Sequence, residues 1–194
     1  MALFKKQGGS FAGKLTALTF ESKDWESEKG KPYSTLTAKL VIEKDGADDS
    51  IEQYLPAGFF YPNDGQTISD DEETLEGGAA VGDSSEFAKF VQSAVEKGIV
   101  EADLLDGDGN GTNFSALVGR RYEFGREINE ERQVAAGRKK LGKVKGATAS
   151  HEELMKAGRQ QDKHDKSKFY NHSYLVISTV FDAEEEKSKK TSSS

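Results

Sequence analysis

The segments SALVGRRYEF (Ser115–Phe124) and FYNHSYLVISTVFD (Phe169–Asp182) decide how this chain is interpreted. Both have the β-branched and aromatic composition of strands, and the long segment Arg126–Lys168 separates them. Within it, Arg132–Lys168 contains 11 Lys and Arg and 4 Asp and Glu residues, a net charge of +7. Because the whole chain carries −7, the remainder carries −14. This separation of charge predicts that the basic segment contacts a polyanion.

Length and composition indicate one main core with attached loops or arms. The chain has 194 residues, of which 35% are hydrophobic. It has no cysteine, which excludes disulfides, thiolate metal sites and cysteine nucleophiles. No apolar run approaches the ~20 residues of a membrane span, and Met1–Ser10 lacks the apolar core of a signal peptide. We therefore expect a soluble, cytoplasmic protein without membrane contact.

Two strands are expected near the N-terminus. Phe11–Phe20 changes its apolar phase midway, close to Gly13, which predicts a β-bulge. Glu21–Lys31 is predicted to be a charged connection that carries Trp25. Tyr33–Lys44 then alternates cleanly between apolar and polar residues, as a half-buried strand does. Its predicted buried face consists of Leu36, Ala38, Leu40 and Ile42.

A short third strand and a long loop follow. Ile51–Leu55 is predicted to be a strand that ends at Pro56, because proline cannot donate to a strand ladder. Ala57–Gly82 has the composition of a loop throughout.

One amphipathic helix is predicted before the strand at Ser115–Phe124. Asp83 and Glu86 fit a capping box at its start, and Gly98 ends it. Its apolar stripe consists of Phe87, Phe90, Val91, Ala94 and Val95. In the basic segment, a cap at Ser150 predicts a short helix that reaches about Arg159.

The predicted order of elements is strand, strand, strand, helix, strand, strand, which is the order of an OB-fold. We therefore predict a mainly β, OB-fold-like five-stranded Greek-key barrel over residues 11–182, with an extended basic insertion at 125–168. The insertion has too few apolar residues to fold alone, so we expect it to be mobile until phosphates neutralise it. Residues 1–10 are expected to be a flexible N-terminus and 183–194 a disordered tail.

Single-stranded nucleic acid is the polyanion that suits this fold. OB-folds bind oligonucleotides on their second and third strands and on the loops after the first and fourth. Bases stack on exposed rings whatever the sequence, and cations neutralise the phosphates. The candidate rings are Trp25, Tyr33, Tyr122, Tyr170 and Tyr174. The candidate cations are Lys39, Arg120, Arg121, Arg138, Lys139, Lys140, Lys143 and Lys145. The alternative interpretations are core positions for the rings and a solvated loop for the basic segment.

Other chemistry has less support in the sequence. The alternating oxygens of Asp106, Asp108 and Asn110 resemble the first half of a calcium loop, but Leu117 occupies the position of the bidentate Glu. A glycine-rich turn is the alternative.

Three histidines without cysteine make little case for zinc: His151, His164 and His172. No nucleophile elbow, phosphate loop or metalloprotease helix is present, so we expect neither an enzyme nor a cofactor.

Several short motifs share the pattern of one protein family. They are Phe11-x-Gly13-x-Leu15, Ile42-x-Lys44-Asp45-Gly46, Tyr54-Leu55-Pro56-Ala57-Gly58, the helix Phe87–Gly98, and Ser115-x-Leu117-x-Gly119-Arg120-Arg121. With these motifs the chain resembles the single-stranded-DNA-binding proteins of tailed bacteriophages, a divergent OB-fold group. The resemblance implies non-sequence-specific binding of single-stranded DNA during phage replication or recombination in the host cytoplasm. Besides single-stranded DNA, the partners we consider are replication or recombination proteins and further copies of the chain.

The C-terminal segment departs from that family. The group often ends in an acidic tail that recruits replication partners, whereas here Asp182–Glu186 is followed by Lys187, Lys189 and Lys190. A recruiting role for this tail therefore does not follow from the resemblance.

Two alternatives from other functional classes remain open. An OB-fold module that recruits a replication or recombination protein would show no salt-dependent affinity for oligonucleotides. A calcium-stabilised structural protein would melt at a lower temperature in EDTA.

Overall fold

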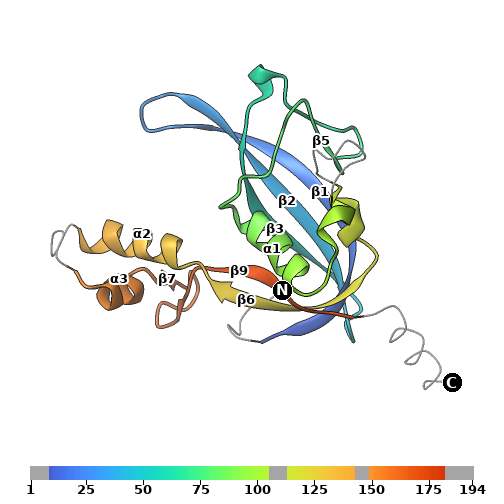
Figure 1. Cartoon of the computed structure of the whole chain (residues 1–194). Coiled ribbons are helices and arrows are strands. Elements are labelled where there is room, and N and C mark those ends of the chain that lie inside the picture. The colour runs from blue at the N-terminus through green and yellow to red at the C-terminus, as the bar shows by residue number, and fades with distance from the viewer. Residues whose placement is uncertain (1–8, 105–112, 143–148, 182–194) are drawn as a thin grey trace. The chain divides into compact units, whose positions relative to one another are not determined.

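The computed structural model describes residues 9–104, 113–142 and 149–181, in two compact units (Figure 1). Of the described residues, we call those in Ser10–Gly125 together with 175–181 the sheet unit, and those in Arg126–Tyr174 together with Gly9 the insertion unit. The insertion unit has buried residues and helices of its own.

Five strands form one sheet in the order β3-β2-β1-β6-β9. They are β1 (Phe11–Glu26), β2 (Pro32–Lys44), β3 (Ser50–Phe60), β6 (Arg121–Ile128) and β9 (Ser173–Val180). β1 pairs antiparallel with both β2 and β6, and β2 pairs antiparallel with β3. The predicted mainly β class is confirmed. Within the described residues the sheet has β3 and β9 as its edges, and no pairing closes it into a barrel.

The shorter elements belong to one unit or the other. The sheet unit contains η1 (Pro62–Asp64), β4 (Thr67–Ile68), β5 (Leu75–Glu76), α1 (Glu86–Glu96), η2 (Glu101–Leu104) and η3 (Phe114–Leu117). The insertion unit contains α2 (Glu130–Leu141), α3 (His151–Ala157), β7 (Gln160–Gln161) and β8 (Phe169–Tyr170). None of the described helices combines the length and the apolar character needed to span a bilayer.

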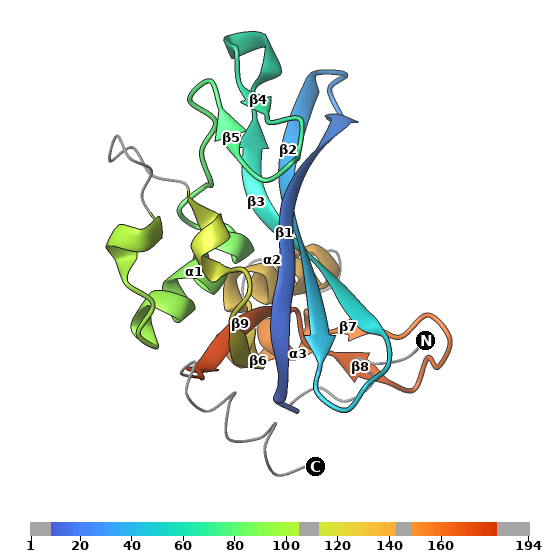
Figure 2. The same ribbon diagram turned by 90° about the vertical axis from the view of Figure 1, so that its right-hand side faces the viewer.

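The core of the sheet unit lies between the sheet and α1 (Figure 2). The alternation in β2 buries the predicted face, and the apolar stripe of α1 packs in the same cluster. Gly98 follows the helix with φ 106°, as predicted. The predicted cap at Asp83 is wrong: Ser85 caps α1, because its Oγ accepts the backbone N–H of Ala88 at 3.0 Å.

The predicted bulge in the first strand is confirmed by a register shift between Leu15 and Ala17. The strand itself is longer than predicted. β1 continues through the charged residues to Glu26, so Trp25 lies in a strand opposite Tyr33 rather than in a connection. The turn of the β1–β2 hairpin is limited to residues 27–31.

The prediction that Pro56 ends the third strand is also wrong. β3 continues to Phe60, and Pro56 lies beside a register shift between Leu36 and Thr37 of β2. Proline is tolerated here because β3 is an edge strand, on which the missing N–H removes no bond inside the sheet.

The two strands predicted in the C-terminal half are shorter than expected. Phe114–Leu117 forms a 3-10 helix, and the strand predicted from Ser115 begins only at Arg121. The strand predicted over Phe169–Asp182 is divided into β8 and β9 by Asn171 and His172.

The described part of the insertion is folded, so its interpretation as a mobile arm is wrong there. Gln133 is almost fully buried, and its amide makes three hydrogen bonds. Its Nε2 donates to the Met155 carbonyl at 2.8 Å and to Asn171 Oδ1 at 3.0 Å, while its Oε1 accepts the His172 N–H at 3.0 Å. These bonds connect α2, α3 and the segment that precedes β9.

The α2 and α3 backbones approach each other closely at two glycines. A Cβ on Gly137 would lie 2.1 Å from the Leu154 carbonyl oxygen, and one on Gly158 would lie 1.9 Å from that of Gln133. Only glycine permits this contact. The predicted cap at Ser150 is confirmed as a complete capping box.

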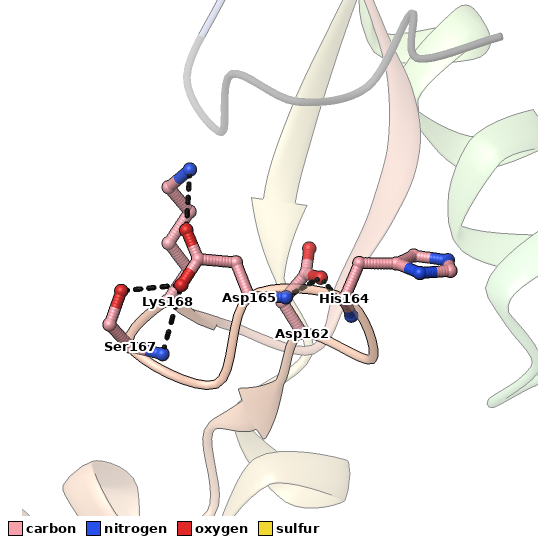
Figure 3. A network of polar contacts seen from close by, with 5 residues as sticks. All are labelled: Asp162, His164, Asp165, Ser167 and Lys168. Atoms are coloured by element: carbon pink, nitrogen blue, oxygen red, sulfur yellow. Dashed lines mark hydrogen bonds and ion pairs between the residues drawn. The ribbon is translucent and has the colours of Figure 1, made fainter.

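The loop between β7 and β8 holds a network of polar contacts (Figure 3). Asp162 accepts the backbone N–H groups of His164 and Asp165, and Asp165 accepts from Ser167 and pairs with Lys168 at 2.9 Å. The hydrogen bond from the Ser167 side chain, followed by that from Lys168, lowers the pKa of Asp165 to about 2.

This lowered pKa predicts acid sensitivity of the loop. Because the pKa of Asp165 is lower in the folded protein than the value of about 4 expected for an unfolded chain, its ionised form stabilises the fold above about pH 4. That contribution should disappear as the pH falls from about 4 to about 2. Hydrogen exchange of the loop amides should show loss of protection in this window, and Asp165→Asn should already lack that protection at neutral pH. Equal pH profiles for both proteins would contradict this prediction.

Candidate nucleic-acid interface

A row of exposed aromatic side chains crosses the sheet unit. The alternation that buries one face of β2 leaves Tyr33 on the other, which we call the outer face. We call Trp25, Tyr33, Phe59 and Tyr61 the ring row; each is between 40% and 60% exposed. Trp25 lies in β1, Tyr33 in β2 and Phe59 in β3, and Tyr61 directly follows β3.

Cross-strand pairing places these rings next to one another. Trp25 is the register partner of Tyr33, and the ring centroids of Tyr33 and Phe59 lie 6.2 Å apart. The centroids of Phe59 and Tyr61 lie 6.4 Å apart. Exposed apolar rings gathered in this way typically mark a binding surface.

The indole of Trp25 is held in position by its neighbours. Its Nε1 donates to Thr35 Oγ1 at 2.9 Å, and the Lys23 ammonium lies 4.4 Å from its ring centroid. The ring is therefore oriented while almost half of it remains accessible to a ligand.

A groove of about 600 Å³ lies beside three members of the ring row, Trp25, Tyr33 and Phe59. It is lined by Trp25, Tyr33, Thr35, Leu36, Thr37, Pro56, Gly58, Phe59, Gly82, Ser84 and Ser85. Gly58 has φ 129°, and a Cβ there would lie 3.0 Å from the Gly82 nitrogen, so glycine allows these two segments to meet. The combination of aromatic walls and hydroxyl groups suits a flat ligand with polar edges.

Lys39, Glu52 and Tyr54 form a second cluster on the outer face. Lys39 Nζ lies 2.7 Å from Glu52 Oε1, and the Tyr54 hydroxyl donates to Glu52 Oε2 at 2.9 Å. The hydrogen bond with Glu52 raises the pKa of Lys39 and also that of Tyr54, while the bond from Lys39 lowers the pKa of Glu52. The three side chains are thus held together by one carboxylate.

Two of the predicted residues on β6 are engaged inside the fold. Tyr122 is fully buried, and its hydroxyl donates to the Leu117 carbonyl at 2.7 Å. Burial raises the pKa of Tyr122 to about 12. Its assignment as a stacking residue is therefore wrong. Arg121 pairs with Asp45 and lies 4.4 Å from the Phe181 ring centroid, whereas Arg120 is exposed.

The predicted residues of the insertion unit include one exposed basic cluster. Arg138, Lys139 and Lys140 are exposed in the last turn of α2, where cations also interact favourably with the helix dipole. The Lys140 ammonium donates to the Arg159 carbonyl at 2.6 Å.

Tyr170 and Tyr174 are half-buried, and the Tyr174 hydroxyl donates to Glu127 at 3.0 Å.

Some candidates lie outside the described residues. These are Lys143 and Lys145 of the basic segment, and Asp106, Asp108 and Asn110 of the calcium-like loop. Among residues 9–104, 113–142 and 149–181, no three His, Asp or Glu side chains converge as metal ligands.

The sequence-based list missed Tyr54, Phe59 and Tyr61. For Phe59 and Tyr61 the reason is that the prediction stopped the third strand at Pro56 and assigned the following residues to a loop, whereas Tyr54 lies inside the predicted strand and was not considered. A signal was present, because Ile51, Leu55 and Ala57 alternate in one phase across the proline, whereas Phe60 joins their buried face only through the register shift beside Pro56.

Comparison of the chain with known protein families, curated proteins and solved structures finds no match in any of the three.

Proposed function

We propose that the protein binds single-stranded DNA without sequence specificity, with the ring row stacking on bases and the basic residues of the insertion unit contacting phosphates. The ring row carries this proposal. Four accessible rings from neighbouring strands offer faces to successive bases, and stacking of this kind does not depend on base identity.

The strand arrangement supports an OB-fold as the scaffold. β1 lies between β2 and β6, and β3 and β9 are the outer strands, which is compatible with an opened five-stranded Greek-key barrel. The ring row lies on the first three strands, and OB-folds bind oligonucleotides on the second and third. Phage replication or recombination in the host cytoplasm is the setting that the family resemblance implies.

A titration with oligo-dT at several salt concentrations tests the proposal. Trp25 is the only tryptophan and belongs to the ring row, so its fluorescence should change as bases stack nearby. Affinity should fall linearly on a log–log plot as salt rises. Absence of binding at low salt would overturn the proposal.

The basic cluster of α2 is expected to set part of the salt dependence. Replacing Arg138 and Lys139 by glutamine leaves the contact of Lys140 with Arg159 intact. If both charges contact phosphate, the slope of log K against log salt should become shallower by about 1.4, because each contact with a single strand contributes about 0.7.

The matched control for this prediction removes two charges from the helix that covers the other face of the sheet. Lys89→Gln in α1 together with Lys97→Gln at its C-cap should leave the slope unchanged. Equal slopes for wild type and the α2 variant would show that the α2 cluster does not contact phosphate. Charge substitution is preferable to deletion of residues 132–168, because deletion would remove the buried Gln133.

A further inference from the structure

We propose that Lys39 and Tyr54 form an additional nucleotide subsite on the outer face, in which the Tyr54 ring is open to a base while Glu52 holds the Lys39 ammonium and restricts its contact with phosphate. In this subsite a base would stack on the Tyr54 ring and its phosphate would contact Lys39. The inference rests on the proposed function, since it extends the path of the same strand.

The two side chains lie on the face that carries the ring row. Lys39 and Tyr54 are register partners on β2 and β3, and Lys39 lies on the same side of β2 as Tyr33. The Tyr54 ring is about half exposed, and the Lys39 ammonium lies 5.7 Å from its centroid. An accessible π-face beside a cation is the pair of groups that grips one nucleotide of a single strand.

Glu52 already occupies the anion position of this subsite. Its two carboxylate oxygens contact the Lys39 ammonium at 2.7 Å and the Tyr54 hydroxyl at 2.9 Å. A phosphate that approached Lys39 would have to displace this carboxylate and would be repelled by it. Because exposed ion pairs are weak, a phosphate can displace Glu52 from Lys39. The loss of the Lys39–Glu52 contact then cancels much of the binding free energy that the new contact between Lys39 and phosphate provides. Glu52 therefore makes Lys39 a latent phosphate contact.

Glu52→Gln is the direct test, because it removes the charge and keeps the shape. Oligo-dT binding at low salt should become about 3-fold tighter or more, and the salt slope should steepen by about 0.7 as Lys39 gains a phosphate. An unchanged affinity and slope would overturn the inference. Wild-type binding to oligo-dT would still support the proposed function in that case, so the two failures are distinguishable.

A double-mutant cycle assigns the gain to Lys39. Lys39→Gln should change the affinity of the wild type little, yet it should reverse most of the gain produced by Glu52→Gln. If Lys39→Gln weakened both proteins equally, Lys39 would contact phosphate regardless of Glu52 and the restricting role would be excluded. Unchanged melting temperatures would show that these surface substitutions leave the fold intact.

The stacking half of the subsite has its own pair of variants. Tyr54→Ala should weaken binding about 5-fold or more, since it removes a ring on which a base stacks. Tyr54→Phe should retain wild-type affinity or exceed it. It keeps the ring and removes only the hydrogen bond that the Tyr54 hydroxyl donates to Glu52. Equal affinities of the alanine and phenylalanine variants would overturn the role of Tyr54.

Discussion

Replacement of Tyr33 and Phe59 together by alanine should weaken oligo-dT binding about 30-fold or more. Alanine substitution of a stacking ring costs roughly 1–3 kcal/mol per base, so two rings account for at least about 2 kcal/mol. Both side chains are exposed and their rings lie 6.2 Å apart, so their removal should leave the core unaffected. Titration of both proteins with oligo-dT, followed by the fluorescence of Trp25, measures the difference.

The matched control keeps the rings and changes their substituents. Tyr33→Phe with Phe59→Tyr preserves both π-faces and should retain affinity close to that of the wild type. The salt slope of the alanine variant should also remain near the wild-type value, because stacking releases few counterions. Loss of affinity in the control, or none in the alanine variant, would show that these rings do not stack on bases.

Gln133→Leu should open the insertion unit without unfolding the sheet unit. The substitution has a similar volume, but it leaves the Met155 carbonyl, the Asn171 side chain and the His172 N–H without the partner that Gln133 provides. The three groups are partly buried, so each lost partner costs an amount near the lower end of roughly 1–3 kcal/mol, and the total is on the order of 3 kcal/mol. Hydrogen exchange of the α2 and α3 amides should accelerate about 10²-fold.

Gln160→Leu provides the control, because Gln160 is exposed in the same unit. It should leave the protection of α2 and α3 unchanged, and in both variants the amides of β1 and β2 should exchange as in the wild type. Equal acceleration in the sheet unit and the insertion unit would contradict the description of two separately stabilised units. Unchanged exchange in the Gln133 variant would contradict the role of its hydrogen bonds.

Elements with a strong local pattern could be predicted from the sequence. The alternation of Tyr33–Lys44 predicted both the strand and its buried face, since each second residue of a strand faces the core. The apolar stripe of α1 and its end at Gly98 followed from helical spacing. The phase change near Gly13 likewise predicted the bulge in β1.

Features that depend on distant neighbours could not be predicted. Pro56 indicates the end of a strand unless the strand is at an edge, and the sheet order that makes β3 an edge is a tertiary property. Tyr122 has the same local appearance as the accessible tyrosines, and only the packing around β6 buries it.

The folding of the insertion was missed because its stabilising contacts are polar. α2 has few apolar residues and an internal glycine, which together resemble a flexible segment. In the structure, Gly137 permits close contact with α3. The buried side chain between the helices is Gln133, which is held by hydrogen bonds rather than by apolar packing. Asn129 before two glutamates, and three cations in the last turn of α2, were the available helix signals.

Photocrosslinking of oligo-dT to the intact protein, with mass-spectrometric identification of the modified residues, tests the central claim most directly. We predict crosslinks at members of the ring row, at Trp25, Tyr33, Phe59 or Tyr61, because these rings would lie against bases. Crosslinks found only at residues outside the outer face of β1, β2 and β3 would contradict the claim.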